Sequence, residues 1–160
     1  MKSLSPSAQK IQAILQRLGS NSVVIEFSES TRTAQEAADR VGCKLGQIVK
    51  SMIFKGQISG KGILVLTSGS NRVDEKKISG YVLEAIGRAD PDFVRSKTGF
   101  AIGGVPPVGH AQPLETFIDE DLMQYPTIWA AAGTPNAVFE LPSTDLARFT
   151  DGKIVRVRPD

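Results

Sequence analysis

Apolar residues recur at two different spacings along the chain, and the spacing separates expected helices from expected strands. Over residues 5–19 they recur every three or four positions, with Ser-Pro at the start and Gly19 at the end, which predicts a helix. Thr33 followed by Glu36 is a capping-box pattern and predicts a second helix that ends at Gly42. Further helices are expected over 74–87 with a break at Gly80, over 90–99 and over 143–149.

Short apolar runs bounded by Gly, Pro or charged residues predict strands. The runs at 47–54 and 63–67, joined by the turn KGQISGKG, predict an antiparallel hairpin. Other strands are expected over 23–27, 116–122, 126–133, 137–141 and 153–159. No linker, repeat or low-complexity tract divides the chain, so we expect one compact α+β domain over 1–160, with a mixed, mostly antiparallel sheet flanked by helices.

Composition narrows the class of protein. A chain of 160 residues that is 41% hydrophobic and 22% charged has the profile of a globular domain with a sizeable core. The N-terminus has no apolar signal region and the apolar runs are too short to span a bilayer, so we expect a cytoplasmic protein with no membrane partner. With one cysteine, Cys43, and one histidine, His110, we expect no disulfide, metal or other cofactor.

The charge pattern limits the nucleic-acid partners. The net charge is only +2 and the basic residues are scattered, whereas a long duplex interface normally shows a denser basic stripe. We therefore expect no DNA partner, while a short contact with one end of an RNA fits the composition.

One lysine interrupts the apolar run QIVKSMIF. In a strand, Lys50 shares its face with Ile48, Met52 and Phe54, so one face is apolar except for this charge. Two interpretations follow. Lys50 lies near a strand end and extends its ammonium group to water, or it is a fixed cation in a pocket.

Two further segments have unusual composition. Residues 99–113, GFAIGGVPPVGHAQP, hold four glycines and three prolines, which is typical of a surface connection or of a stiff loop whose backbone approaches a ligand. Residues 129–141, WAAAGTPNAVFEL, predict a tight hairpin with a wall of small side chains. This hairpin is either simply part of a sheet or the wall of a small pocket.

Taken together, these segments resemble the YbaK/ProX family, the stand-alone relatives of the prolyl-tRNA synthetase editing domain. The resemblance is carried by GQIVKSMIF, TGFAIGGVPPVGHAQP and AAGTPNAVFELPSTDLARFT, in this order and spacing, and extends over nearly the whole chain. It implies the fold of that family, with a sheet that is partly barrel-like, as one editing domain over 1–160. It also implies a trans-editing hydrolase that cuts the ester between a wrongly attached amino acid and the tRNA 3′ end.

The resemblance assigns candidate site residues by position. Lys50 matches the family's essential lysine, expected to hold the 3′-terminal phosphate or ribose region and to stabilise developing charge. Gly104 is expected to act with it, and Gly103 and Gly109 match the glycine loop, whose backbone is expected to hold the substrate carbonyl and the attacking water. The other expected substrate-binding residues are Phe27, Thr31, Thr33, His110, Ala131 and Gly133.

The resemblance also implies a substrate class and partners. The expected substrate is mischarged tRNA(Pro) carrying alanine, 2-aminobutyrate or cysteine, because a synthetase pocket rejects a smaller amino acid only weakly. Ala131 stands where cysteine-directed members carry serine, so alanine or another small amino acid is at least as suitable as cysteine. The expected partner is the acceptor end of an aminoacyl-tRNA, with prolyl-tRNA synthetase as a further candidate.

The matched positions offer no obvious Asp, Glu or His as a general base. Water would then be activated by a backbone carbonyl, by the substrate itself or by the tRNA ribose, with positioning supplying much of the rate. The alternative function is a non-catalytic module that binds tRNA or a synthetase. A metal-dependent hydrolase is disfavoured by the single histidine.

Overall fold

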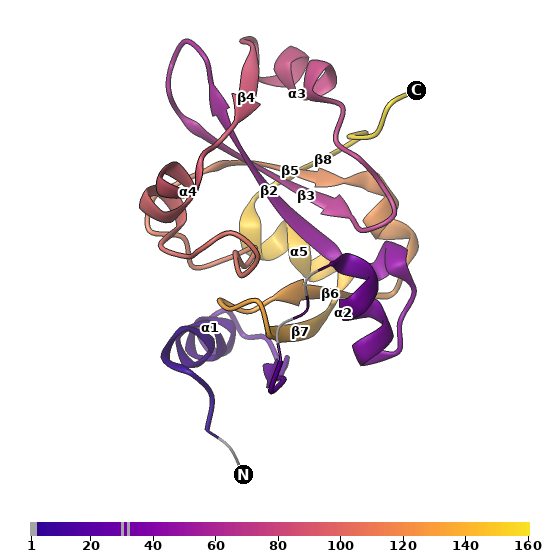
Figure 1. Cartoon of the computed structure of the whole chain (residues 1–160). Helices are drawn as coiled ribbons and strands as arrows, with labels where there is room; N and C mark the ends of the chain where they lie inside the picture. Colours follow the sequence, from indigo (N-terminus) through magenta and orange to yellow (C-terminus); the bar gives the residue numbers. More distant parts are fainter. Residues whose placement is uncertain (1–2, 30, 32) are drawn as a thin grey trace.

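The computed structural model describes residues 3–29, 31 and 33–160, which form two β-sheets with helices packed around them (Figure 1). The larger sheet has the strand order β4-β2-β3-β5-β8 and the smaller one β1-β7-β6. The strands are β1 (Ile25–Glu26), β2 (Val49–Gly56), β3 (Gly62–Ser68), β4 (Ile86–Arg88), β5 (Glu115–Asp119), β6 (Thr127–Ala131), β7 (Ala137–Pro142) and β8 (Lys153–Val155). The helices are α1 (Pro6–Arg17), α2 (Ala34–Val41), α3 (Glu75–Val82), α4 (Pro91–Thr98) and α5 (Ser143–Thr150), with short 3-10 helices η1 (Leu45–Gln47) and η2 (Glu120–Gln124).

Helix ends lie where the capping residues predict them. The Thr33 side chain accepts a hydrogen bond from the Glu36 N–H at the start of α2, and the Asp90 side chain accepts one from the Phe93 N–H at the start of α4. Gly42 and Gly99 end these two helices in the left-handed conformation that a C-terminal glycine adopts readily.

Several local predictions are wrong. Residues 120–122, expected at the end of a strand, begin the 3-10 helix η2, and residues 156–159, expected in the last strand, lie beyond β8. The expected break at Gly80 is absent, since α3 continues through this residue and ends at Leu83, which itself adopts φ 63°. The end of the segment expected to be helical, 86–88, is instead strand β4, which pairs with the end of β2. Sheet pairing thus decides the conformation of a segment whose own pattern is too short to do so.

The predicted hairpin of β2 and β3 is confirmed, with Lys50 opposite Thr67. β2 also pairs antiparallel with β4, whereas β3–β5 and β5–β8 are parallel pairs, so the larger sheet is mixed. The expected partial barrel is not closed. Among the described residues, the backbones of the two sheets are joined by one isolated bridge, between Ile48 and Trp129.

Two hydrophobic clusters cover opposite faces of β3, which is buried along its whole length. The main cluster lies between the larger sheet, the smaller sheet, α1, α4 and α5, and includes Leu64, Leu66 and Phe139. The second lies on the other face of the larger sheet, beneath α3, and includes Ile63 and Val65 (Figure 1). β3 therefore anchors the hairpin that carries Lys50. In the described part of the chain, no helix is long and apolar enough to cross a membrane.

We expect Phe139→Ala to lower the free energy of unfolding by about 3–5 kcal/mol, because Phe139 is fully buried in the main cluster and its loss leaves a cavity. Urea denaturation followed by circular dichroism measures the effect. The control is Ile58→Ala, at a side chain that is 86% exposed, with an expected change within about 0.5 kcal/mol. Equal losses in the two variants would contradict this description of the core.

Candidate active site between two diverging strands

A pocket of about 270 Å³ opens where β2 and β6 separate beyond the bridge between Ile48 and Trp129. Residues 48–52 of the β2 segment form one wall and residues 129–131 form the opposite wall. The remaining wall residues come from α2 and the segment before it, from two loops and from the start of β7: Thr31, Thr33, Ala34, Ala37, Ile102, Gly103, Val105, Thr134, Pro135, Ala137 and Val138. Many of these side chains are small and apolar, and the cavity of about 270 Å³ is itself small for a ligand site.

Lys50 is the one cation among the described residues that line this pocket. Its half-buried side chain donates a hydrogen bond from Nζ to the Asn71 carbonyl oxygen, at 3.2 Å. An ammonium group has three N–H donors, and Lys50 forms no ion pair with any described residue. The structure thus supports the interpretation of Lys50 as a fixed pocket cation, with charge and donors available to a ligand.

The free edge of β2 brings a second residue into the site, Ser51. Ile48 accepts from the Gly69 N–H of the segment that follows β3, whereas Ile53 accepts from the Ala89 N–H on the opposite side. Backbone groups alternate between the two sides of a strand, so the N–H and C=O of Ser51 point away from β3. β4 pairs only with Phe54–Gly56, so these groups of Ser51 face the pocket rather than another strand.

Ser51 was not predicted as a site residue. Periodicity assigns the face on which a side chain lies, but not which edge of a strand stays unpaired. The neighbouring lining residues Met52 and Trp129 were missed for the same reason, since their contact with the pocket depends on how far the two sheets separate.

The glycine loop forms the back of the pocket and is tied to the hairpin that follows β6. The Gly133 N–H donates to the Gly104 carbonyl at 3.0 Å. A Cβ atom on Gly104 would lie 2.8 Å from the Thr134 Cα, and one on Gly133 would lie 2.9 Å from the Ser7 carbonyl oxygen. Gly103, which lines the pocket, has φ 93°. Gly104 and Gly133 lie behind the lining and hold two walls together.

Thr31, Thr33 and Ala131 also line the pocket, as expected for substrate-binding residues. Thr31 donates from both its N–H and its hydroxyl group to the Pro135 carbonyl, at 3.2 and 3.0 Å. Phe27 lies outside the lining, where its backbone exchanges two hydrogen bonds with Asn136. Phe27 therefore orders the hairpin turn next to the pocket rather than forming its surface.

His110 and Gly109 lie elsewhere. His110 faces a separate, more open cavity of about 560 Å³, formed by residues 107–116, 149–151 and 153, which shares no lining residue with the Lys50 pocket. Its Nε2 lies 2.7 Å from the Pro106 carbonyl oxygen, and burial lowers the pKa of the ring below its ordinary value of 6.5. A Cβ atom on Gly109 would lie 2.7 Å from Ile14 Cδ1, so Gly109 packs against α1. The structure does not bring these two residues to Lys50.

The described lining residues include no Asp, Glu, His or Cys. Cys43 packs beside Trp129 and Ile48, and burial raises the pKa of its thiol, which disfavours the thiolate. Among described residues, no group of three potential metal ligands occurs. The described lining residues offer a ligand one ammonium group, unpaired backbone groups, three threonine hydroxyl groups and one serine hydroxyl group.

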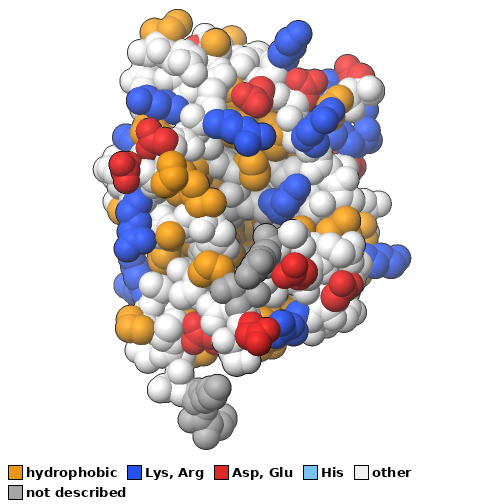
Figure 2. Space-filling model, viewed as in Figure 1, with side chains coloured by type: hydrophobic (Ala, Val, Ile, Leu, Met, Phe, Trp, Pro, Cys, Tyr) orange, Lys and Arg blue, Asp and Glu red, His pale blue; other side chains and the backbone are white. Residues whose placement is uncertain are grey.

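Charge on the molecular surface is dispersed. Figure 2 shows Lys and Arg side chains interspersed with Asp, Glu and hydrophobic ones, without a continuous basic stripe on the face drawn. This arrangement suits recognition of a small group together with a short contact, rather than of a long duplex.

A narrow, largely apolar pocket with one lysine beside a strand edge is typical of a site that binds a small substrate. The family follows from the sequence, because residues 28–149 match the model of the aminoacyl-tRNA editing domain. The chain belongs to this family.

Three relatives agree with this assignment. The chain is 33% identical over 131 residues to "Uncharacterized protein YwhH" of Bacillus subtilis, covering 82% of this chain and 83% of the relative. It is 26% identical over 136 residues to "Putative Cys-tRNA(Pro)/Cys-tRNA(Cys) deacylase EbsC" of Enterococcus faecalis, covering 82% and 80%. A crystal structure of "a putative trans-editing enzyme for prolyl tRNA synthetase" is 46% identical, with a TM-score of 0.93 over 99% of this chain and 100% of that one. The family and α+β fold expected from the resemblance are confirmed.

We expect Gly104→Ala to lower the free energy of unfolding by about 1–3 kcal/mol, because the added Cβ would overlap the Thr134 backbone. Thermal and urea unfolding measure the change. Gly80→Ala is the matched control, since a Cβ there meets nothing within 4 Å and alanine favours the helix, so this variant should gain up to about 1 kcal/mol. A neutral Gly104→Ala would show that the two walls are not in close contact.

Because burial lowers the pKa of His110 in the folded protein, the unfolded chain binds the proton more readily. The stability that depends on neutral His110 is thus complete above pH 6.5 and falls as the pH drops below this value, towards the folded-state pKa. Unfolding free energies measured from about pH 7.5 to 5 should fall more steeply for the wild type than for His110→Gln. Parallel curves would mean that His110 is solvated.

Proposed function

We propose that this protein hydrolyses the ester bond of mischarged tRNA, with tRNA(Pro) carrying a small non-cognate amino acid as substrate, and that residues 1–160 act as one editing domain. The observation that carries the proposal is the pocket itself: a small cavity whose described lining residues include one cation, Lys50, without an ion-pair partner among the described residues, in a chain of the editing family. Names of relatives point in the same direction, to deacylation of Cys-tRNA(Pro) and to trans-editing for prolyl-tRNA synthetase.

The pocket walls favour a small amino acid. Ala34, Ala37, Ala130, Ala131 and Ala137 all contribute to the lining, and the cavity of about 270 Å³ is small for a ligand site, which favours a small side chain. A site that admits small side chains and excludes larger ones removes errors that an aminoacylation pocket rejects only weakly. Ala131 offers no hydroxyl group to a thiol, so alanine and 2-aminobutyrate are at least as suitable as cysteine, and proline, the cognate amino acid, should be spared.

The chemical step is attack of water on the ester carbonyl carbon. The bond between this carbon and the ribose oxygen breaks, the ribose oxygen takes a proton, and the products are the free amino acid and tRNA with an intact 3′ end. The Lys50 ammonium group would stabilise negative charge on the carbonyl oxygen or hold the terminal phosphate or ribose. The Ser51 N–H and the backbone of Gly103 are suited to orient the substrate from opposite walls.

The proton of the attacking water has to be accepted by a group other than a protein carboxylate or imidazole, since the described lining residues include neither. Backbone carbonyls such as that of Ser51, the α-amino group of the substrate in its neutral form and the tRNA ribose are the available acceptors. Catalysis would therefore rest on positioning and on charge stabilisation more than on a general base. A metal ion or cofactor is not part of the proposal.

We expect Lys50→Ala to reduce deacylation by about 10²–10³-fold, because it removes the charge closest to the reacting ester. The assay follows loss of alanine, 2-aminobutyrate, cysteine, serine or proline from separately charged tRNA(Pro). Lys55→Ala is the matched control, since Lys55 is an exposed residue of the same strand and lies against Phe93 rather than in the pocket. Proline should be spared by every variant.

Two outcomes would overturn the proposal. Equal rates for Lys50→Ala and the wild type would remove Lys50 from the mechanism. Binding of tRNA by the wild type without hydrolysis of any of the five esters would instead identify a non-catalytic tRNA-binding module.

A further inference from the structure

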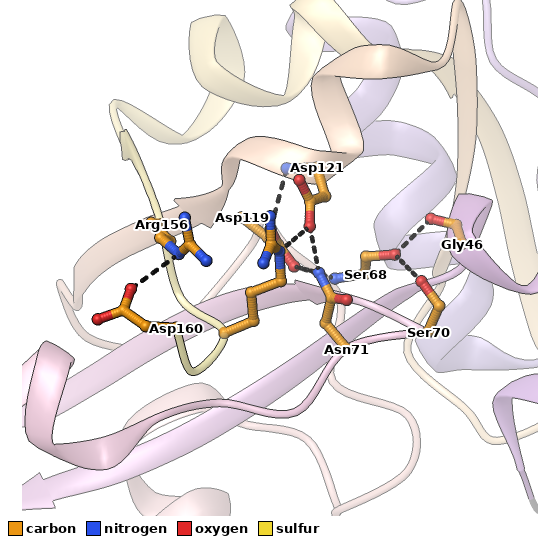
Figure 3. Close-up of polar contacts among 9 residues, drawn as sticks. Gly46, Ser68, Ser70, Asn71, Asp119, Asp121, Arg156 and Asp160 are labelled. Atoms are coloured by element: carbon orange, nitrogen blue, oxygen red, sulfur yellow. Dashed lines mark hydrogen bonds and ion pairs between the residues drawn. The ribbon is translucent and has the colours of Figure 1, made fainter.

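The hydrogen-bond partner of Lys50 is itself held by two carboxylates (Figure 3). The backbone carbonyl oxygen of Asn71 accepts from Lys50 Nζ. The side-chain amide of Asn71 donates from Nδ2 to Asp119 Oδ2 at 2.9 Å and to Asp121 Oδ2 at 2.8 Å. Both N–H groups of the amide have an acceptor, and each acceptor is a carboxylate. The residue that holds Lys50 is thus tied in place by two charge-assisted hydrogen bonds.

Asp119 connects this arrangement to the core. It is fully buried at the end of β5, and its Oδ2 also accepts from the Ser68 N–H at 3.0 Å, at the end of β3. Its Oδ1 accepts from the Asp121 N–H at 2.9 Å. A buried carboxylate with three N–H donors is satisfied only in one geometry, so it fixes the ends of two strands relative to Asn71.

Asp121 connects the same arrangement to the C-terminal segment. Arg158 Nε donates to Asp121 Oδ2 at 2.7 Å. The hydrogen bond from Asn71, followed by the contact with Arg158, lowers the pKa of Asp121 below its ordinary value. Asp121 is therefore ionised at neutral pH and remains an acceptor for the Asn71 amide.

The loop that carries Asn71 is held from the other side as well. The Asn71 N–H donates to the Ser68 carbonyl at 2.9 Å, and the Gly69 N–H donates to the Ile48 carbonyl at 2.7 Å. Ser68 Oγ donates to the Gly46 carbonyl at 2.7 Å and lies 3.1 Å from Ser70 Oγ. The loop after β3 is thus fastened to the segment just before Lys50 in the sequence.

We propose that Asn71 is a positioning residue for Lys50, acting through its backbone carbonyl while its amide is clamped by Asp119 and Asp121. The proposal rests on the proposed function, since it concerns the same pocket. Lys50 contacts a neutral carbonyl rather than a carboxylate, so its position is fixed while its charge stays free for an anionic or developing negative group. A direct ion pair would fix the lysine equally well but would compete with the substrate.

Two variants remove the clamp in different ways. Asn71→Ala deletes the amide, so the backbone carbonyl loses the two hydrogen bonds that hold it through the side chain. Asn71→Asp has almost the same shape, but it cannot donate to the two carboxylates and it adds a like charge beside them. Ser70→Ala is the matched control, because Ser70 lies in the same loop and contacts only Ser68 Oγ in this network.

The first test observes Lys50 directly and does not depend on activity. In protein labelled with ¹⁵N-lysine, the Lys50 ammonium signal is assigned by its loss in Lys50→Ala. We expect this signal to shift and to exchange faster with water in both Asn71 variants and to stay unchanged in Ser70→Ala. An unchanged Lys50 signal in either folded Asn71 variant, judged by its circular dichroism spectrum, would overturn the proposal.

The second test is a double-mutant cycle on deacylation. Misplacing a reacting group by about 1 Å can cost on the order of 100-fold in rate, so we expect Asn71→Ala to lower kcat/KM by roughly 10- to 100-fold. In the Lys50→Ala background the same substitution should cost nothing further, because Asn71 acts only through Lys50. Losses that multiply would contradict a positioning role.

The two tests separate this proposal from the proposed function. If the wild type hydrolyses no aminoacyl-tRNA, the proposed function fails, and the ammonium signal still decides whether Asn71 holds Lys50. If hydrolysis occurs but the Lys50 ammonium signal is the same in the Asn71 variants as in the wild type, only the positioning role fails.

Discussion

The site depends on the separation of two strands that meet at a single bridge. Ile48 and Trp129 join the larger and smaller sheets, and beyond this bridge β2 and β6 move apart. Edge strands present unpaired N–H and C=O groups, which proteins usually cover or blunt. Here the diverging edges enclose a small pocket, so the backbone groups of Ser51 face a ligand site instead of another strand.

Placing a lysine at this point has a physical cost that the surroundings reduce. A buried charge is unfavourable unless it is hydrogen-bonded or partly hydrated. Lys50 remains half-buried and has one neutral acceptor, Asn71, while the nearby carboxylates are already occupied by the Asn71 amide and by Arg158. The acids of this region therefore organise the site without neutralising its cation.

Local signals predicted much of the fold. Thr33, Asp90, Gly42 and Gly99 mark helix ends through interactions within a few residues, and the β2–β3 hairpin is closed by a short turn. Strand pairing between segments far apart in the chain was harder to predict from the sequence. Strand β4 is too short to show a period, and the unclosed sheets depend on contacts between segments far apart in the chain.

The residues of the candidate site also divide into those that could be predicted from the sequence and those that could not. The resemblance pointed to Lys50, Thr31, Thr33, Gly103 and Ala131, and the structure brings these five residues to one pocket, although their roles stay predictions. His110 is close to the glycine loop in sequence, yet its side chain leaves this loop towards another cavity. Spacing along the chain cannot tell on which side of an irregular loop a side chain emerges. Ser51 and Asn71 were missed for another reason, because both contribute backbone groups whose pairing depends on contacts between distant segments.

The most direct measurement is an NMR titration of backbone amides with alanine linked to the 3′ position of adenosine through a hydrolysis-resistant amide bond. If the pocket between β2 and β6 holds the aminoacyl end, the largest shifts will fall on residues 48–52, 102–105 and 129–134. Shifts centred on residues 107–116 and 149–153, around His110, would contradict the central claim.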